Sequence, residues 1–493
     1  MQALNSILPF LAVLAPLTAL PGILSASRAP NAREAWTFFA ALLMLGLVGS
    51  MVPAVLAGSE YYFLLAPVIP GAPLALRVDA MGMLFALVSS SLWVVTSIYS
   101  IGYMRGLNEH AQTRFFAFFA LSLFAAVGVA FSANLLTMYL FYELLSFATY
   151  PLVTHHQDAD SRASGRKYLT FIVGTSIGLV LPAMILVYNL TGTLDFQAAG
   201  AIGSLASPTL LIVLLAALLF GFAKAGLMPV HSWLPAAMVA PTPVSSLLHA
   251  VAVVKVGVFC IFRVVTGVFG PETLANLGLG GFITAVAAIT MTVASLIALT
   301  QDGLKRRLAF STIGQLSYIV LGAGLLNAAG MTGGLLHIAM HAFGKITLFF
   351  CAGAIFVATG EKYISKMSGI GRRMPLTMLA FFIGSLSIIG IPPTGGFLSK
   401  WNLLTGCMDG QHWVLAGVLI FSSLLNAAYF LPIVYRAFFC PPDQCLHSGP
   451  VKEAPLLCIV PPLITAGLSV AVFFYPDIFL TLARMAVAAT LGV

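Results

Sequence analysis

The residues of this chain that could do chemistry gather in a proline-rich stretch between Phe220 and Gly257. Four prolines interrupt the stretch, which carries Lys224, His231, His249 and Lys255 in apolar surroundings. Proline removes a backbone donor and clashes with the preceding turn, so no unbroken helix can run through the stretch. Lysine and histidine can each take up and release a proton, and an ionisable side chain within an apolar span indicates function. We interpret the stretch as one half of an ion pathway.

The composition indicates where this pathway must lie. Of the 493 residues, 60% are hydrophobic and only 8% are charged, and the mean hydropathy is +1.02. A soluble domain could not hide so much apolar surface, so we expect an all-α polytopic membrane protein. Broken backbone at membrane depth is then tolerated only where protein or a water-filled cavity surrounds it.

About fourteen apolar segments are long enough to cross roughly 30 Å of hydrocarbon. We interpret the first as a permanent span, because a signal peptide would have a basic start and a clear cleavage site. We expect the short apolar tail from Ile478 to Val493 to lie at the membrane interface. The segments are 5–25, 36–57, 80–101, 114–131, 134–153, 168–190, 209–236, 244–266, 279–300, 307–326, 333–358, 376–405, 413–437 and 455–475.

The charges of the connecting loops predict the orientation. Sixteen lysines and arginines fall in the loops that follow odd-numbered segments, whereas the opposite side has only Arg77 and Arg484. Because cytoplasmic loops carry the excess of positive charge, we expect both termini on the outer face of the cell membrane.

Five cations fall inside the expected spans, together with one acidic residue. Arg263 lies near the outer end of its segment, so we expect it to reach the headgroups and to have a structural part. Glu143 is the only acid in the middle of a span. The other four cations are lysines, which are costly in a membrane and therefore indicate function. They are Lys224, Lys255, Lys345 and Lys400.

Glu143 forms a polar stripe with Tyr139, Ser146 and Tyr150 at helical spacing. Such a stripe needs a partner across the bundle, and we expect Lys224 to be that partner. Desolvation favours the neutral form of each group, whereas a nearby opposite charge favours the ionised form. A pair of this kind would store or release a proton according to the distance between its members.

His337, His341 and Lys345 follow one another at intervals of four residues. On a helix they share one face, with about 6 Å of rise between neighbours. Imidazole carries protons in both directions near neutral pH, so the row is a candidate relay. The alternative, satisfied core histidines with a capping lysine, stays open. Zinc binding is disfavoured, because no acidic or thiol ligand lies near these histidines in the sequence.

A second broken segment contains Pro392, Pro393, Gly395 and Gly396, followed by Lys400. The two broken segments are five spans apart and so cross the membrane in opposite directions. Discontinuous helices at matching positions of two halves predict an inverted repeat, with ions passing where the helices are broken.

Four motifs carry a resemblance to a known family. They are HSWLPAAMVAPTPVSSLLHA, DGLKRRLAFSTIGQLSY, HIAMHAFGK and GIPPTGGFLSKW. Over about residues 75–440 the chain resembles the antiporter-like membrane subunits of respiratory complex I, Mrp-type cation/proton antiporters and membrane-bound hydrogenases. Lys400 stands where one branch has glutamate, and FLSKW looks more like the D-type component of Mrp antiporters or a hydrogenase-type component.

The resemblance implies a fold of fourteen helices with two inverted five-helix repeats. It divides the chain into helices 1–3 (1–110), a first repeat of helices 4–8 (111–270), a second repeat of helices 9–13 (271–440), and helix 14 with the tail (441–493). It also implies that five residues match the family's proton-path positions along the membrane midplane, namely Glu143, Lys224, Lys255, Lys345 and Lys400. We add His337 and His341 to this path, with His231 and His249 in support.

The chain itself is expected to bind no cofactor. It has no cysteine array for an iron–sulfur cluster and no GxGxxG motif, so any redox chemistry must belong to partner subunits. Cys440, Cys445 and His447 share one loop, but C-x4-C-x-H spacing alone is a weak indication of a metal site.

Two functions from different classes follow. In the first, the chain is a proton-translocating subunit of a respiratory complex, whose partners carry flavin, iron–sulfur or nickel–iron centres. In the second, it is the D-type component of an Mrp-type monovalent cation/proton antiporter without a redox partner. A stand-alone solute symporter is a weaker alternative. Both assemblies contain other membrane subunits and move protons or sodium, and neither binds nucleic acid.

Overall fold

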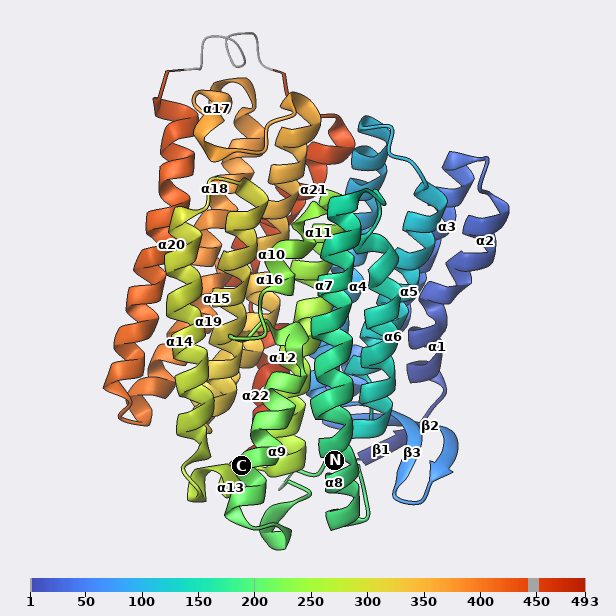
Figure 1. The fold of residues 1–493 in the computed structure, drawn as a ribbon. Coiled ribbons are helices and arrows are strands. Elements are labelled where there is room, and N and C mark those ends of the chain that lie inside the picture. Colours follow the sequence, from blue (N-terminus) through green and yellow to red (C-terminus); the bar gives the residue numbers. More distant parts are fainter. Residues whose placement is uncertain (1, 199, 442–451, 493) are drawn as a thin grey trace.

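The computed structural model describes residues 2–198, 200–441 and 452–492. Most of these residues are helical, and long helices run side by side along one axis of the molecule (Figure 1). Nine helices of the described ranges are long and apolar enough to cross a membrane. The expectation of a multi-pass membrane protein is confirmed. Several other expected spans are divided into shorter helices by the breaks described below.

The first helices form one edge of the bundle (Figure 1). They are α1 (Leu8–Leu14), a 3-10 turn η1 (Ala15–Thr18), α2 (Ala19–Ser25) and α3 (Pro30–Leu56), whereas the next helix, α4 (Ala80–Gly106), lies further inside and packs against the last two helices of the chain. The first expected span thus consists of α1, η1 and α2 in succession. α3 packs against both α2 and α4, which places it between the edge and the interior.

A small sheet covers one end of the bundle. β1 (Gln2–Asn5) pairs in parallel with β2 (Ser59–Ile69), and β2 pairs antiparallel with β3 (Ala72–Val78). The expectation of an all-α chain is therefore wrong here. The sequence does contain a hairpin signal, because β-branched and aromatic residues precede Pro70 and Gly71. Gly71 adopts a φ of +74° at the turn, which only glycine reaches without strain.

The next helices follow α4 along the chain. They are α5 (Gln112–Ala130), α6 (Leu135–Val153), α7 (Ala159–Thr175), a π-helical turn η2 (Ser176–Val180), α8 (Leu181–Thr191) and a 3-10 turn η3 (Gly203–Leu205). Side chains cap two of them, because Asn134 accepts from the amide of Thr137 and Asp158 from that of Ser161. These caps satisfy amides that have no partner within the helix. α6, which carries Glu143, packs against α5 and α7.

The first expected break is confirmed. It comprises α9 (Pro208–Gly221), a 3-10 turn η4 (Ala223–Ala225), α10 (Trp233–Ala236), a 3-10 turn η5 (Ala237–Val239), α11 (Thr242–Ser246), a π-helical turn η6 (Leu247–Val251), α12 (Val253–Val264) and a π-helical turn η7 (Val265–Phe269). Backbone groups freed by the break have side-chain partners. Trp233 Nε1 donates to the Ala223 carbonyl oxygen at 3.0 Å, and the Met228 amide donates to Thr290 Oγ1 at 3.2 Å. Protein therefore replaces the water that this backbone lacks.

The second half of the chain is arranged around one long central helix, α16. Its elements are α13 (Pro271–Asn276), α14 (Leu279–Thr300), α15 (Leu304–Gly324), α16 (Ala328–Thr359), a 3-10 turn η8 (Ile364–Lys366), α17 (Ile370–Arg373), α18 (Pro375–Ile389), α19 (Gly395–Asp409) and α20 (Trp413–Phe439). α16 packs against α15, α18 and α19. The gap between α18 and α19 confirms the second expected break.

The tail differs from expectation. α21 (Leu456–Phe474) is followed by α22 (Asp477–Leu491), which packs against α16 and α4. Leu482 and Ala483 are fully buried, and the ring of Phe479 lies 5.8 Å from that of Phe343. The tail therefore covers apolar surface of the bundle instead of lying at the membrane interface.

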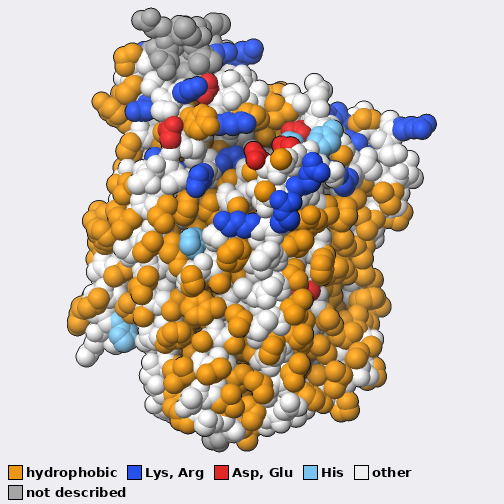
Figure 2. Space-filling view, in the orientation of Figure 1, with side chains coloured by type: hydrophobic (Ala, Val, Ile, Leu, Met, Phe, Trp, Pro, Cys, Tyr) orange, Lys and Arg blue, Asp and Glu red, His pale blue; other side chains and the backbone are white. Residues whose placement is uncertain are grey.

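Positive charge gathers at one end of the molecule. In Figure 2 lysines and arginines lie over the upper end, whereas hydrophobic side chains dominate the surface below it. Both termini lie at the opposite end, on the same side as the sheet (Figure 1). We refer to these two ends as the basic end and the sheet end. The termini and the basic loops thus lie at opposite ends of the molecule.

The sequence predicts that Arg263 reaches the headgroups, and this prediction is wrong. Its side chain is only 5% exposed, and both terminal nitrogens donate to the carboxylate of Asp79, the residue before α4. Burial acts to raise the pKa of this carboxyl group, but the adjacent Arg263 charge holds the pKa at about 2. The pair therefore stays ionised at physiological pH and joins α12 to α4. The prediction fails because the Arg263 guanidinium group finds a partner within the protein, the carboxylate of Asp79.

We expect Asp79→Asn to lower the free energy of unfolding by about 3–5 kcal/mol, because it leaves the buried Arg263 charge uncompensated. The thermal unfolding midpoint of the purified protein measures this effect. Asp195→Asn changes an exposed acid and should unfold like the wild type. Equal midpoints for all three proteins would contradict the structural part given to the pair.

Candidate functional site

Five elements bring the predicted site residues into the interior. α6 carries Glu143, η4 carries Lys224, α12 carries Lys255, α16 carries the two histidines and Lys345, and α19 carries Lys400. Three of the lysines and both histidines are at most 1% exposed, whereas Glu143 and Lys400 are half-buried. Within the described part of the chain, none of the four lysines forms an ion pair with an acidic group at 4.0 Å or less.

Lys224 is held by α6. Its Nζ atom donates to the Tyr142 carbonyl oxygen at 2.9 Å and to Ser146 Oγ at 2.6 Å. It also lies 3.2 Å from the centre of the Tyr142 ring, so the negative face of the ring adds to the attraction. Neutral groups of one helix turn therefore compensate the charge of this lysine.

Glu143 lies on the same turn of α6, but it does not form the expected contact with Lys224. Both of its carboxylate oxygens are buried, and neither has a hydrogen-bond partner among the residues that the structure describes. In this conformation the two groups are neighbours, and the lysine binds Tyr142 and Ser146 on either side of the acid instead of the acid itself.

Lys255 contacts the central helix. Its Nζ atom lies 2.5 Å from Nδ1 of His341, which joins α12 to α16. Gly257, two residues further along α12, lies directly against the backbone of Lys224 and Ala225. α12 therefore holds the two lysines close to each other. The close approach depends on the absence of a side chain at position 257.

The two histidines of α16 share a face, as their spacing predicts. Their rings are stacked at 5.7 Å with an interplanar angle of 17°. His337 contacts Ser399 Oγ at 2.8 Å through Nδ1 and Gln315 Oε1 at 3.1 Å through Nε2. Ser399 precedes Lys400 in α19, so the histidine pair connects Lys255 with the second broken segment.

Lys345 lies one turn beyond His341 and contacts α15. Its Nζ atom donates to Ser311 Oγ at 2.8 Å and to the Leu308 carbonyl oxygen at 3.4 Å. The Tyr429 hydroxyl donates to Asn426 Oδ1 and can accept from the Ser311 hydroxyl, whose oxygen lies 3.0 Å away. A chain of neutral hydroxyl and amide groups thus extends from Lys345 to α20.

Lys400 lies beside the second break. Its Nζ atom donates to the carbonyl oxygens of Ile388 and Ile389 at 2.8 and 3.0 Å and to Ser423 Oγ at 3.1 Å. These carbonyl groups end α18, where the helix dipole favours a cation. The ammonium group also lies 4.6 Å from the centre of the Tyr318 ring. The break therefore supplies the acceptors that the lysine needs.

Of the two supporting histidines, the structure describes only the side chain of His231, which takes part in none of the contacts described above for this row. His231 is half-buried in the loop after η4, and its Nδ1 atom has no hydrogen-bond partner among the described residues. The side chain of His249 lies outside the part that the structure describes. The same holds for Cys445 and His447 of the weakly indicated metal site, whereas Cys440 follows α20 and is half-buried.

The sequence analysis did not single out the neutral partners of the row. Gln315, Ser311 and Ser399 are fully buried, as are Tyr429 and Asn426. The only feature of the sequence that could have indicated these residues is that each is a polar side chain in an apolar span. That signal is weak for serine and tyrosine, since both occur in ordinary membrane helices. Only Gln315 and Asn426 stand out from the sequence on these grounds.

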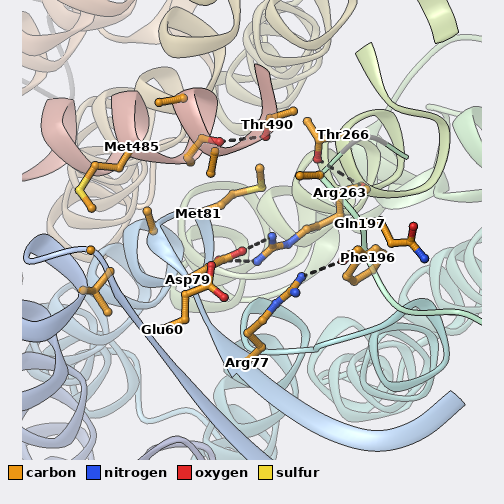
Figure 3. A pocket seen from close by; sticks show the side chains of 18 of the residues that line it. Glu60, Arg77, Asp79, Met81, Phe196, Gln197, Arg263, Thr266, Met485 and Thr490 are labelled. Carbon is orange, nitrogen blue, oxygen red and sulfur yellow. Dashed lines mark hydrogen bonds and ion pairs between the residues drawn. The ribbon is translucent and has the colours of Figure 1, made fainter. Parts of the chain in front are cut away.

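Two cavities lie towards the two ends of the bundle. The first has a volume of about 520 Å³ at the basic end and is lined by Tyr103, Glu109, Thr242, Lys305 and Lys362, among others. The second has a volume of about 490 Å³ at the sheet end. Figure 3 shows Glu60, Arg77, Asp79 and Arg263 around it, together with Met485 and Thr490 of α22.

The first broken segment, which runs from α9 to η7, contributes residues to both cavities. Thr242 of the first cavity begins α11, which continues through η6 into α12. α12 then passes Lys255 and reaches Arg263 at the second cavity. The row of lysines and histidines therefore lies on elements that extend between two hollows at opposite ends.

Comparison with known proteins gives consistent results. Residues 132–426 match the family described as NADH:quinone oxidoreductase/Mrp antiporter, TM. The chain is 34% identical over 394 residues to NADH-quinone oxidoreductase subunit N of Desulforudis audaxviator (strain MP104C), covering 76% of each chain. It is 32% identical over 434 residues to hydrogenase-4 component B of Escherichia coli (strain K12), covering 83% of this chain and 63% of that protein. Its fold matches a chain of the Mrp complex from Dietzia sp. DQ12-45-1b with a TM-score of 0.87, 23% sequence identity and coverage of 98% and 96%.

We expect Gly257→Val to force α12 and η4 apart, because the new side chain would overlap the backbone of Lys224 and Ala225. Overpacking of this kind costs about 1–3 kcal/mol, which a lower unfolding midpoint would show. Gly281→Val in α14 is the matched control, since a side chain there meets open space. If the two variants unfold at the same temperature, α12 and η4 are not in close contact.

Proposed function

This chain belongs to the NADH:quinone oxidoreductase/Mrp antiporter family of transmembrane proteins, and we propose that it moves protons across the cell membrane as one subunit of a multi-subunit respiratory complex. The proposed complex is of the NADH:quinone oxidoreductase or membrane-bound hydrogenase kind. The single observation that carries the proposal is the buried row of lysines and histidines on elements that extend between the two cavities.

The contacts of the row suit proton transfer. Lys255 and His341 are 2.5 Å apart, and His341 is stacked on His337. An imidazole ring accepts a proton on one nitrogen and releases one from the other, so it can pass charge between α12 and α19. Water can bridge the wider gaps of the row. Neutral acceptors around Lys224, Lys345 and Lys400 allow each lysine to exchange partners without separating an ion pair.

Glu143 and Lys224 form the switch of this mechanism. When Lys224 binds Tyr142 and Ser146, the carboxylate is left without a partner; a small movement of the flexible lysine side chain would bring the two charges together. Formation of the pair favours the ionised form of both groups, and separation favours their neutral forms. Alternation between the two arrangements would take up and release protons at this end of the row.

The fold supports the finer architecture that we propose. It consists of fourteen membrane crossings with inverted repeats over residues 111–270 and 271–440. Lys224 and Lys400 follow the ends of α9 and α18, and these would be corresponding positions of the two proposed repeats. The equivalence of the two breaks supports the repeat, because discontinuous helices recur in matching places of inverted halves.

The second candidate function is that of the D-type component in an Mrp-type monovalent cation/proton antiporter. The similarity of the whole fold to a chain of an Mrp complex favours it, as does lysine at position 400. If the chain belongs to a respiratory complex, its partners include redox subunits with flavin, iron–sulfur or nickel–iron centres, while this chain binds no cofactor. If the chain belongs to an Mrp-type antiporter, its partners are other membrane subunits alone, and the exchanged ions include sodium. Purification of the intact complex, with identification of its subunits and of any bound flavin and iron, separates the two readings.

We further propose that both termini lie outside the cell, since the basic end would then face the cytoplasm. A reporter fused after Val493 that is active only outside the cytoplasm should be active. A second fusion after Lys366, in a basic loop, should be inactive. The reverse pattern would contradict this orientation.

We expect Glu143→Gln and Lys224→Ala each to abolish proton transport while the assembled complex persists. Each change leaves a single buried group that can lose its charge by a change of protonation, so the fold is spared more than the function. Glu143→Asp should retain partial activity, since the carboxylate survives with about 1.5 Å less reach. Proton flux into vesicles with matched complex content measures the effect.

Lys452→Ala is the control, because it removes an exposed lysine outside the row. Its flux should equal that of the wild type. Wild-type flux in Glu143→Gln would show that the acid is structural, and the proposed switch would then be wrong.

A further inference from the structure

Two turns at the basic end bring three histidines around one carboxylate. Glu109 and His110 lie between α4 and α5, and His155 and His156 lie between α6 and α7. The Oε2 atom of Glu109 is 3.9 Å from Nδ1 of His110, 3.7 Å from Nε2 of His155 and 3.7 Å from Nδ1 of His156. None of these residues belongs to the row described above.

The spacing of these atoms suits a metal ion. The ligand atoms of Glu109, His110 and His156 all lie within 4.8 Å of one another. Four ligands at about 2.1 Å from a tetrahedral zinc ion are separated by roughly 3.4 Å. The distances to Glu109 are therefore only a few tenths of an ångström wider than those of a bound state, and small side-chain rotations would close them.

The ring of His110 is oriented for this purpose. Its Nε2 atom lies 3.0 Å from the His155 carbonyl oxygen, which can only accept a hydrogen bond. The proton therefore belongs on Nε2, and the lone pair of Nδ1 points towards Glu109. A backbone carbonyl that fixes the tautomer of a ligating histidine is a common companion of metal sites. Arg114 donates to the same carbonyl at 2.7 Å and so steadies the turn.

His155 is the observation that points to a ligand. Its side chain is fully buried, and neither ring nitrogen has a hydrogen-bond partner within the described ranges. Buried polar groups nearly always have a hydrogen-bond partner. A buried imidazole that lacks one and faces a carboxylate therefore indicates a partner that is not part of the chain. A metal ion, or water bound to one, would supply it.

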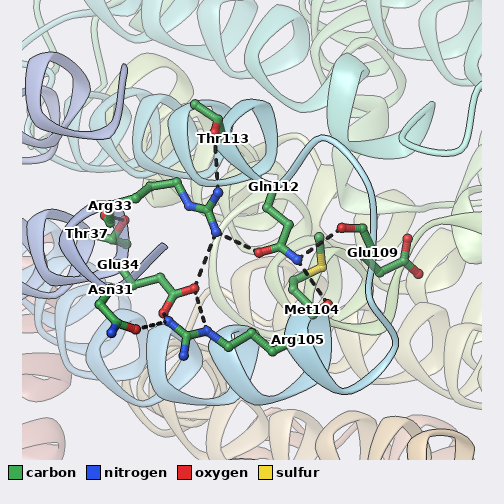
Figure 4. Close-up of polar contacts among 9 residues, drawn as sticks. All are labelled: Asn31, Arg33, Glu34, Thr37, Met104, Arg105, Glu109, Gln112 and Thr113. Carbon is green, nitrogen blue, oxygen red and sulfur yellow. Dashed lines mark hydrogen bonds and ion pairs between the residues drawn. The ribbon is translucent and has the colours of Figure 1, made fainter. Parts of the chain in front are cut away.

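The turn that carries Glu109 is held in place from the other side. Gln112 donates to the carbonyl oxygens of Met104 and Glu109 at 3.2 and 3.0 Å, and it accepts from Arg33 at 2.6 Å. In Figure 4 the Glu109 carboxylate points away from this cluster. Arg33 and Arg105 form ion pairs with Glu34. The Glu109 carboxylate therefore has no arginine partner among the described residues and faces the histidines.

We propose that Glu109, His110 and His156, with His155 behind them, form a binding site for a first-row divalent metal ion of the Zn²⁺ type. Imidazole nitrogens with one carboxylate suit zinc and its neighbours in the series, whereas Mg²⁺ and Ca²⁺ require mainly oxygen ligands. Because Glu109 and His156 also line the cavity at the basic end, the bound ion would lie at the rim of that cavity. It would join the α4–α5 turn to the end of α6, the helix that carries Glu143. This assignment does not depend on the proposed transport function.

The test uses the full-length chain, purified with a histidine-free tag, treated with chelator and titrated with Co²⁺ and Zn²⁺. The background carries Cys440→Ser and Cys445→Ser to remove competing thiol ligands. We expect one Co²⁺ per chain with the visible absorption of a low-coordinate nitrogen and oxygen site, displaced by Zn²⁺. Glu109→Gln and His156→Ala should each weaken binding at least about tenfold, and His155→Ala should do so because the ion or its bound water then loses the His155 imidazole as a partner.

His412→Ala is the matched control, since His412 is an exposed histidine between α19 and α20. It should bind Co²⁺ like the background protein. Zn²⁺ should also raise the unfolding midpoint of the background protein and of His412→Ala but not that of Glu109→Gln, which separates lost binding from lost folding. Equal affinity in Glu109→Gln, His156→Ala and the background protein would overturn the proposal, as would the absence of any stoichiometric binding.

Discussion

The cost of burying four lysines in an apolar bundle is the constraint on which the rest of this structure depends. An isolated ammonium group loses the water that solvates it, and only hydrogen bonds or opposite charge can replace that water. For the residues that the structure describes, the replacement comes from carbonyl oxygens, hydroxyl groups and one imidazole ring. Carboxylates take no direct part in it. The interior therefore binds the amino groups of its lysines through neutral acceptors.

The helix breaks make this arrangement feasible. A continuous helix uses all of its carbonyl groups internally, whereas the end of a helix leaves several free. Lys400 binds two such carbonyl groups at the end of α18, and Lys224 lies in the short turn that follows α9. At Lys400 the break and the lysine stabilise each other, because the freed oxygens need a donor and the ammonium group needs acceptors. Lys224 lies beside its break as well, but its acceptors belong to the neighbouring helix α6.

Among the residues that the structure describes, ion pairs lie at the two ends of the bundle and not at its centre. Asp79 and Arg263 join α4 to α12 near the sheet, and Glu34 binds Arg105 at the basic end. Such pairs hold helices in fixed positions, whereas hydrogen bonds to neutral groups can exchange at lower cost. Rigid ends with an adaptable centre suit a protein that moves protons along a row of side chains. The histidine cluster at the basic end adds a point at which an external ion could act on that row.

The sequence by itself determined the membrane class, the two breaks, the buried lysines and histidines, and the charge asymmetry of the ends. These properties are local: hydropathy, proline and charge act where they occur along the chain. Only the tertiary structure decided which groups meet. It paired Lys255 with His341, directed Lys224 past Glu143 to neighbouring oxygens, and joined Arg263 to Asp79. The choice of partners depends on how each helix is rotated and packed against helices that are remote in sequence, and no local pattern contains that information.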